Sequence, residues 1–555
     1  MKDKITQAVR TACRDLFSID VEVELTRPDE QFGDFATNVA LQLAKRLGKN
    51  PHDIGNMLIE KLSVLDELHE VTLAGQGFIN LRLSDSALAN IDKQDKDNLL
   101  TGKKIVIEYS DPNPFKPLHA GHLYTTLVGD SIARLLEKAG ADVIRINFGG
   151  DVGLHVGKSM WAIVRTLGGE YPDKLNEIAE DSRSSWMGER YVEGSLAYAN
   201  DKTSRNEIIE MNKKVYKFHE TTDRKSHLAQ IYWTCRQWSY DYFTKLYEQL
   251  QVVPFDRFIS ESEVTPLGVK TVREQLERGV YKISDGAVIF DGEKLGLHKR
   301  VFISSEGLPT YEAKDVGLSL TKWQDYNFDE SIIITANEQA QYMQVVLASL
   351  RQFAPEQANR TKHLTHGLLR MAGGAKMSSR KGNIITASDV LNAAHQAGNQ
   401  NGNKSSASSM LAAVKYAFIK SRIGSDVIYN PKQSVALEGN SGPYLQYAHA
   451  RAYSILEKSY QVTATDLDGL EADERSLLLK ITEYQDIFEK SVAELMPHYI
   501  CTYLYELAQK FNRFYEYNRV LGDPRENIRI QIVKKYTNVL RRGLELLGIE
   551  APNKM

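Results

Sequence analysis

The chain has few cysteines, no long uncharged apolar run and no large net charge, and each absence excludes a class of protein. Its three cysteines are scattered over 555 residues without a CxxC pair or a Cys/His cluster, which argues against structural zinc and a disulfide framework. No stretch is apolar over enough residues to predict a membrane span, and the N-terminus lacks the apolar segment of a signal peptide. We therefore expect a cytoplasmic protein with no structural metal and no membrane partner.

The composition is that of an ordinary globular protein with several domains. Apolar residues make up 42% and charged residues 25% of the sequence, and a chain of this length divides into roughly three or four domains of ~100–200 residues. The net charge of −3 gives no overall basic field for nucleic acid. Such a partner would therefore have to bind a local patch.

The most informative stretch, residues 105–147, is predicted to form a strand, a loop, a helix and a second strand. Ile105–Ile107 is a short apolar run typical of a buried parallel strand. Prolines in the loop prevent an early helix start, and Gly140 stands where a glycine would close the helix that follows. The unit predicts a doubly wound α/β fold with a crevice at the carboxyl end of the strand.

The helix of this unit begins with the sequence HAGH, residues 119–122. His119 and His122 are three residues apart and project to one side, while Gly121 lets a ligand approach the backbone closely. A helix N-terminus favours anions, and two imidazole donors beside it suit a polyphosphate better than a metal. Two ordinary histidines at a helix start explain HAGH alone equally well.

Different patterns flank this unit. Residues 1–100 predict a small α/β domain with a strand at Val21–Leu25. Phe78 and Asn80 follow a flexible glycine, and their side chains could stack on and hydrogen-bond an unstacked RNA base. A buried phenylalanine after a turn would explain the same pattern. A helical insertion rich in core aromatics follows at about 155–285. Strands then resume at 288–290, 301–303, 332–334 and 363–371.

The last part of the chain is predicted to be helical and locally basic. Residues 392–409 are polar and of low complexity, which predicts a mobile surface loop before a helical bundle. Within residues 501–555, ten lysines and arginines stand against six acids, and tyrosines and phenylalanines alternate with them. This pattern suits an RNA-binding module, and the same aromatics would also serve as the core of a bundle.

HAGH, followed after the insertion by KMSSR at 376–380, resembles the HIGH and KMSKS motifs of class I aminoacyl-tRNA synthetases. Several longer segments resemble arginyl-tRNA synthetase in particular, and the likeness covers nearly the whole chain. They are GDFATNVALQLAK (33–45), EYSDPNPFKPLHAGH (108–122), TYEAKDVG (310–317), KMSSRKGN (376–383), GNSGPYLQYAHAR (439–451) and LGIEAPNKM (547–555).

The resemblance implies a monomeric α/β protein with four parts. The four parts are a small N-terminal α/β domain that binds tRNA (1–100), a split Rossmann-like parallel-sheet catalytic domain (101–395), a connecting segment (396–430) and an all-α helical anticodon-binding bundle (431–555).

The implied reaction uses ATP, bound with Mg²⁺, to convert L-arginine to arginyl-adenylate and transfers the arginine to the 3′-terminal adenosine of tRNA(Arg). Activation would itself require tRNA. The implied catalytic residues are His119, His122, Lys116 and Lys376. The implied ATP-binding residues are His119, Gly121, His122, Lys376, Met377, Ser378 and Ser379. Those for arginine are Glu108, Asp111, Asn113, Tyr311, Asp315 and Gln339, and those for tRNA are Phe78, Asn80, Tyr447, Arg451 and Tyr515.

The residue types agree with this chemistry, with two departures from the family pattern. A guanidinium is best recognised by carboxylates, and Glu108 and Asp315 come from opposite halves of the nucleotide fold. Ser379 stands where KMSKS has its second lysine, and the resemblance implies that Lys116 substitutes for it. Asp111 stands where many relatives have a small residue, and we expect its carboxylate to face the α-ammonium of the substrate.

Two alternatives remain open on the sequence. One is a small nucleotidyltransferase of the HIGH type, although such an enzyme needs no C-terminal bundle. The other is a non-catalytic synthetase relative that binds RNA, which loss of HAGH or of the lysine loop would favour; both are intact. Arginine-dependent exchange of pyrophosphate into ATP would distinguish all three.

Overall fold

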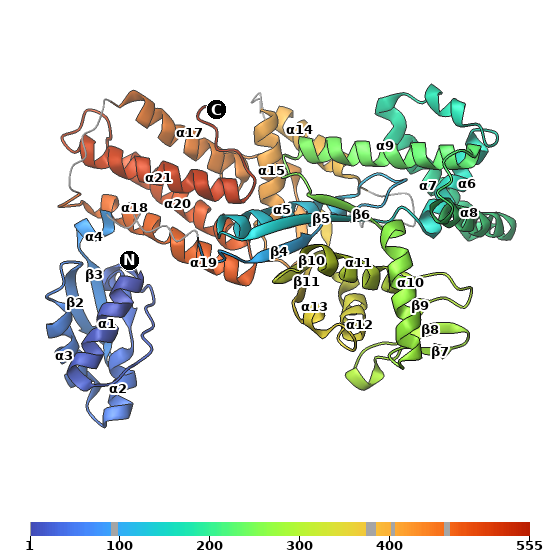
Figure 1. Cartoon of the computed structure of the whole chain (residues 1–555). Coiled ribbons are helices and arrows are strands. Elements are labelled where there is room, and N and C mark those ends of the chain that lie inside the picture. The colour runs from blue at the N-terminus through green and yellow to red at the C-terminus, as the bar shows by residue number, and fades with distance from the viewer. Residues whose placement is uncertain (1, 90–97, 373–384, 401–405, 460–466) are drawn as a thin grey trace.

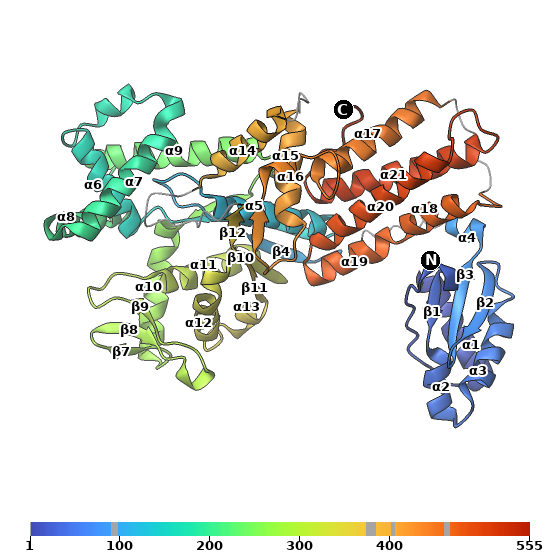
Figure 2. The ribbon, with the colours of Figure 1, turned by 180° about the vertical axis from the view of Figure 1, so that it is seen from behind.

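The computed structural model describes residues 2–89, 98–372, 385–400, 406–459 and 467–555. Figures 1 and 2 show a central sheet with helices around it, a helical bundle at one end, and a separate N-terminal unit beneath that bundle. Within these ranges, no helix combines the length and the apolar character that crossing a membrane requires.

The N-terminal unit is a three-stranded antiparallel sheet packed with helices. Val21, Val23 and Leu25 are buried alternately, as in a strand, but the predicted strand Val21–Leu25 is wrong because this segment forms no ladder. The sheet order is β1-β3-β2. The elements are α1 (Lys2–Phe17), β1 (Phe35–Thr37), α2 (Val39–Leu47), α3 (Pro51–Leu62), β2 (Leu68–Ala74), β3 (Phe78–Leu83) and α4 (Asp85–Ala89).

The middle of the chain is built on a five-stranded sheet of order β11-β10-β4-β5-β6, in which every described pairing is parallel. The predicted strand–helix–strand unit is confirmed, and Gly140 takes the left-handed conformation expected after the helix. The elements are β4 (Lys104–Glu108), α5 (Ala120–Lys138), β5 (Asp142–Gly149), β6 (Arg257–Ser260), β10 (Glu330–Ala336) and β11 (Thr361–His366).

The helical insertion is shorter than the predicted range 155–285. Residues 257–260 form β6, which pairs with β5 and belongs to the central sheet; its four residues are too few to give a clear strand pattern between long helices. Trp161 and Trp238 are buried, as expected of core aromatics. The helices are α6 (Leu154–Thr166), α7 (Arg183–Asn200), α8 (Lys202–Glu220), α9 (His227–Gln249) and then α10 (Glu261–Glu277).

The predicted strands at 288–290 and 301–303 exist, but they form a separate antiparallel sheet of order β7-β8-β9. The predicted strand 363–371 is interrupted at Gly367, where a Cβ would lie 2.2 Å from the Ser425 carbonyl oxygen, so its second part pairs with β13 instead. The elements are β7 (Lys282–Ser284), β8 (Ala287–Phe290), β9 (Arg300–Ile303), α11 (Tyr311–Tyr326), α12 (Ala340–Leu350), α13 (Pro355–Asn359), β12 (Leu369–Met371) and β13 (Val427–Tyr429).

Residues 392–400 and 407–409, which the polar composition predicts as loop, are helical. Val390, Leu391, Ala394 and Ala397 are buried at helical spacing, so a few apolar residues suffice to hold this segment. The remaining helices form the bundle: α14 (Ala387–Gln400), α15 (Ala407–Ile419), α16 (Pro431–Ser434), α17 (Gly442–Lys458), α18 (Ala472–Thr482), α19 (Tyr484–Glu494), α20 (His498–Tyr517) and α21 (Glu526–Leu546).

Two glycines allow α10 and α11 to pack with their backbones in contact. A Cβ at Gly317 would lie 2.2 Å from the Val264 carbonyl oxygen, and one at Gly268 would lie 2.0 Å from that of Ala313. Because neither obstacle is a flexible side chain, the two helices would have to separate. This contact fixes the helix that carries Tyr311 and Asp315.

We predict that Gly317→Ala lowers the free energy of unfolding by about 1–3 kcal/mol, since overpacking forces backbone shifts. Urea denaturation followed by tryptophan fluorescence would measure the loss. Lys270→Ala, an exposed change on α10, serves as the control and should stay within about 0.5 kcal/mol. Equal midpoints for the two variants would show that the close contact is unimportant.

Candidate active site

A pocket of about 410 Å³ lies at the carboxyl ends of the parallel strands. Its walls come from the loop after β4, the start of α5, the first turns of α10 and α11, and the end of β10. Nine residues predicted for ATP or arginine line it: Glu108, Asp111, Asn113, His119, Gly121, His122, Tyr311, Asp315 and Gln339.

The two HAGH histidines are stacked, with ring centroids 3.7 Å apart. His119 Nδ1 accepts hydrogen bonds from the backbone N–H groups of Gly121 (3.1 Å) and His122 (3.3 Å), so its proton is on Nε2. Burial lowers the pKa of His119 to about 4 and that of His122 well below its usual range. Both rings are therefore neutral at pH 7, and His122 Nδ1 has no hydrogen-bond partner among the described residues.

This capping changes two expectations about the start of α5. The backbone N–H groups of Gly121 and His122 are not free for an anion, because they already donate to the His119 ring. Gly121 is also needed for the histidine itself, since a Cβ there would lie 2.9 Å from His119 Nδ1. Any anion in the pocket would therefore meet imidazole N–H donors.

Lys116 lies close enough to the histidine pair to lower the pKa of both rings by its charge. Its ammonium group stacks over Tyr191, 5.3 Å from the ring centroid, and burial lowers the pKa of Lys116 to about 8. It remains mostly protonated at neutral pH. The other predicted lysine and its neighbours, Lys376, Met377, Ser378 and Ser379, lie outside the described residues.

The two predicted carboxylates, Glu108 and Asp315, do line one pocket, but their partners differ. Glu108 is buried and accepts a hydrogen bond from Lys322 Nζ at 2.6 Å. That lysine comes from α11 and also donates to Ser331. The charge of Glu108 is thus already paired, which the sequence does not predict.

Asp315 receives a hydrogen bond from the Tyr342 hydroxyl and has no cationic partner among the described residues. Burial raises the pKa of Asp315 to about 8, with Glu108 and Glu261 adding repulsion. Tyr311, one turn earlier on α11, is 57% exposed at the mouth of the pocket. Asp315 is thus a carboxyl group that a bound cation would ionise.

Asp111 is held by the backbone of β5. Its Oδ1 accepts a hydrogen bond from the Phe148 N–H at 2.7 Å, and its φ of 48° lies in the left-handed region. Burial and the nearby Glu108 raise the pKa of Asp111 well above its usual range. Close by, a Cβ at Gly150 would lie 2.3 Å from Asn113 Oδ1, so this glycine leaves room for the asparagine.

Glu261 is a pocket residue that the sequence patterns do not predict. It follows β6 directly, forms a buried ion pair with Lys314 of α11, and has a pKa raised by burial. An acid just after a parallel strand is the signal that would have identified it, but the strand lies inside the range predicted as helical insertion. Within the described residues, no group of His, Cys, Asp and Glu is arranged to hold a metal ion.

Family models match three consecutive parts of the chain. Residues 84–430 match "tRNA synthetases class I (R), catalytic domain". Residues 1–83 match "Arginyl tRNA synthetase N terminal domain", and residues 445–555 match "DALR anticodon binding domain".

The chain belongs to the arginyl-tRNA synthetase family.

Individual relatives agree with this assignment over the full length. The arginine–tRNA ligase of Lactobacillus delbrueckii subsp. bulgaricus is 30% identical, and that of Flavobacterium psychrophilum 28%, with 100% of both chains covered in each case. The synthetase shares its fold with the Thermus thermophilus arginyl-tRNA synthetase (TM-score 0.80, 23% identity, 100% of both chains) and with the Plasmodium falciparum enzyme (TM-score 0.77, 21% identity, 100% and 99% covered). Its reaction is therefore the ATP-dependent ligation of arginine to tRNA.

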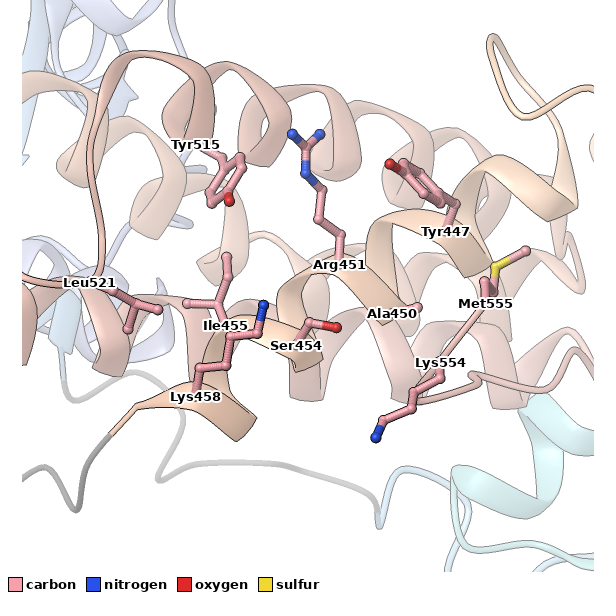
Figure 3. A pocket seen from close by; sticks show the side chains of 10 residues that line it. All are labelled: Tyr447, Ala450, Arg451, Ser454, Ile455, Lys458, Tyr515, Leu521, Lys554 and Met555. Atoms are coloured by element: carbon pink, nitrogen blue, oxygen red, sulfur yellow. The ribbon is translucent and has the colours of Figure 1, made fainter.

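In the bundle of the synthetase, the three residues predicted for tRNA line one surface pocket of about 470 Å³. Figure 3 shows Tyr447 and Arg451 on α17 and Tyr515 on α20 around it. The guanidinium of Arg451 lies 4.4 Å from the centroid of Tyr515. We call this the aromatic pocket. Other basic-region aromatics, such as Phe511 and Phe514, are buried in the bundle core.

The two tRNA residues predicted in the N-terminal unit differ in accessibility. Phe78 is 45% exposed at the start of β3, so the alternative of a buried phenylalanine is wrong. Asn80, two residues further along the central strand of its sheet, is only 7% exposed. The expectation that Asn80 reads a base edge is therefore unsupported, because its amide group lies inside the unit.

We predict that Lys322→Met destabilises the synthetase by about 3–5 kcal/mol, because it leaves Glu108 buried without its cation. The double variant Glu108→Leu/Lys322→Met should recover most of this loss, since an apolar pair needs no compensation. Thermal unfolding measures both effects. If Lys322→Met were as stable as the wild type, the Glu108–Lys322 ion pair would not stabilise the end of β4.

Proposed function

We propose that the pocket behind HAGH is the site where arginine is activated, with ATP at the histidine end and the arginine side chain at the acidic end. The observation that carries this proposal is the position of Asp315, a half-buried carboxyl group with no cationic partner among the described residues, in the same pocket as two neutral histidines. Arginine offers a planar cation that such a carboxylate binds through two hydrogen bonds. The arginine carboxylate then attacks the α-phosphate and releases pyrophosphate.

At the ATP end, His119 and His122 donate hydrogen bonds to phosphate oxygens as negative charge moves onto the leaving group. Neutral imidazoles already fixed by stacking and by the helix need no reorganisation when this charge develops. Lys116 adds a positive charge, and Lys376 to Ser379 complete the ATP site as the family resemblance implies. Mg²⁺ arrives with the nucleotide, which the pocket positions for in-line attack.

At the arginine end, Asp315 binds the guanidinium, Tyr311 packs on it, and Asn113 and Gln339 hold the α-amino and carboxylate groups. Asp111 faces the α-ammonium with the oxygen that Phe148 does not bind. Glu108 and Glu261 disfavour an unbalanced negative charge on Asp315, although each is paired with a lysine of α11. A neutral or anionic amino acid would gain nothing from this environment.

The adenylate then esterifies the terminal adenosine of tRNA(Arg), while the aromatic pocket and the exposed Phe78 bind other parts of the same tRNA by stacking. We place the synthetase in the cytoplasm as a monomer. We also propose that the domains of the synthetase meet near residues 100, 395 and 430.

The decisive experiment is exchange of radiolabelled pyrophosphate into ATP with each amino acid, with and without tRNA. Exchange with arginine, and with tRNA present, is expected. Exchange with another amino acid would place a different substrate in the pocket, and no exchange under any condition would indicate a non-catalytic RNA-binding protein.

We expect His122→Ala to lower kcat by roughly two to three orders of magnitude, because removing one donor to developing charge costs roughly 2.7–4 kcal/mol. The KM for arginine should change little. His52→Ala, an exposed histidine of the N-terminal unit, is the control. A loss below about tenfold in His122→Ala would contradict the phosphate role.

Arginine affinity should depend on pH through Asp315. Because the pKa of Asp315 is about 8 without ligand, the group must lose a proton to bind a guanidinium, so affinity should rise by up to about tenfold per pH unit between pH 6 and 8 and level off above. Asp315→Asn should raise the KM and flatten this slope. Glu338→Gln, an exposed acid of the same pocket, should keep it; an unchanged slope in Asp315→Asn would disprove the assignment.

A further inference from the structure

Helix α5 carries the two histidines at its start and is held at its far half by distant parts of the chain. Ser131 Oγ donates a hydrogen bond to the Leu546 carbonyl oxygen at 3.2 Å, at the end of α21. Asp130 Oδ1 accepts one from the Val253 N–H at 3.0 Å, in the turn after α9. The position of α5 is thus set jointly by the bundle and by the end of the insertion.

A buried lysine completes this contact. Lys415 of α15 is 1% exposed, and its Nζ donates to the Gly548 carbonyl oxygen at 2.5 Å. Gly548 closes α21 in the left-handed conformation (φ +64°), and a Cβ there would lie 3.0 Å from Lys415 Nζ and 3.1 Å from Asp130 Oδ2. A cation at helix-terminal carbonyls is a favourable arrangement. The contact between α21 and α5 is therefore closely packed, and a side chain at position 548 would not fit without moving Lys415 or Asp130.

The residues after this contact lead directly to the aromatic pocket. We call residues 547–555 the C-terminal strap. Lys554 and Met555 at its end line the aromatic pocket together with Tyr447 and Arg451 (Figure 3). Along the way it is fastened to α17 by hydrogen bonds from Gln446 Nε2 to the Glu550 carbonyl (2.8 Å) and from His449 Nδ1 to the Pro552 carbonyl (2.8 Å), and by the ion pair Lys554–Glu457 (3.1 Å).

We propose that Lys415 and Gly548 are positioning residues, which seat α5 and its two histidines against the C-terminal strap and make that seat depend on what occupies the aromatic pocket. A nucleotide in the pocket touches Lys554 and Met555. A shift of these two residues is passed along the nine-residue strap to Gly548, which contacts Asp130. Helix α5 is continuous from Asp130 back to His119, so a shift at Asp130 also moves the histidines. A ligand shifts such an equilibrium only through contacts that differ between its states, and these two terminal side chains provide them.

This inference rests on the proposed function, since it takes RNA as the occupant of the aromatic pocket. The two can fail separately. If Arg451→Ala left tRNA affinity unchanged, the RNA role of the pocket would be wrong. If tRNA bound normally but the pocket and the active site were independent, only the present inference would be wrong.

The experiment measures coupling between the two sites in the full-length protein. The Kd of a tRNA(Arg) transcript is determined by fluorescence anisotropy with and without arginine plus a non-hydrolysable ATP analogue; the ratio is the coupling factor, which is reciprocal by thermodynamic linkage. The variants are Lys415→Met and Gly548→Ala. Their matched controls are Lys420→Met, on the same helix with its Nζ on the Asn440 carbonyl (3.0 Å), and Gly469→Ala, at φ +69° in open space.

We expect a wild-type factor within the roughly 5–150-fold range typical of coupled sites. Lys415→Met and Gly548→Ala should bring it towards one and lower kcat at saturating tRNA by about tenfold, with KM values for ATP and arginine within about twofold. Both controls should match the wild type. A Lys415→Met protein that is indistinguishable from Lys420→Met, or a wild-type factor of one, would overturn the inference; Lys415→Met decides alone if Gly548→Ala fails to fold.

Discussion

The parallel direction of the central strands decides where the pocket forms and which residues line it. Because β10, β4, β5 and β6 all run the same way, their carboxyl ends meet at one edge, and the polar residues that follow them converge there. Glu108 ends β4, Glu261 follows β6, and the loop after β4 leads to the histidines of α5. Residues far apart in sequence thus line one pocket, without any one segment containing the site.

Burial at this edge makes the pocket electrically asymmetric. At one end, carboxyl groups are crowded and desolvated, so the pKa of Asp315 rises to about 8 while Glu108 and Glu261 depend on lysines of α11. At the other, desolvation keeps the histidines neutral and lowers the pKa of Lys116 to about 8. The same physical cause therefore supports both parts of the proposed site, a cation at one end and phosphate oxygens at the other.

Much of this arrangement could be predicted from sequence, because the signals are local. HAGH on a strand–helix unit and the Tyr311–Asp315 spacing each lie within one element, and the pocket unites them as expected. What could not be predicted depends on tertiary contacts. Short β6 is hidden among long helices, so Glu261 is missed; the lysine partners of the acids come from a helix whose register only the fold reveals. In α14, which contains the polar residues 392–400, the buried side chains of Val390, Leu391, Ala394 and Ala397 outweigh the polar composition.

We propose that a half-buried, largely protonated Asp315 becomes the counter-ion of the bound guanidinium. The most direct test of this proposal is titration calorimetry of arginine binding at pH 7 in buffers of different ionisation enthalpy, with tRNA present. Because the pKa of Asp315 lies about one unit above that pH, the wild type is predicted to release close to one proton more than Asp315→Asn does. Equal proton release by the two proteins would contradict the proposal.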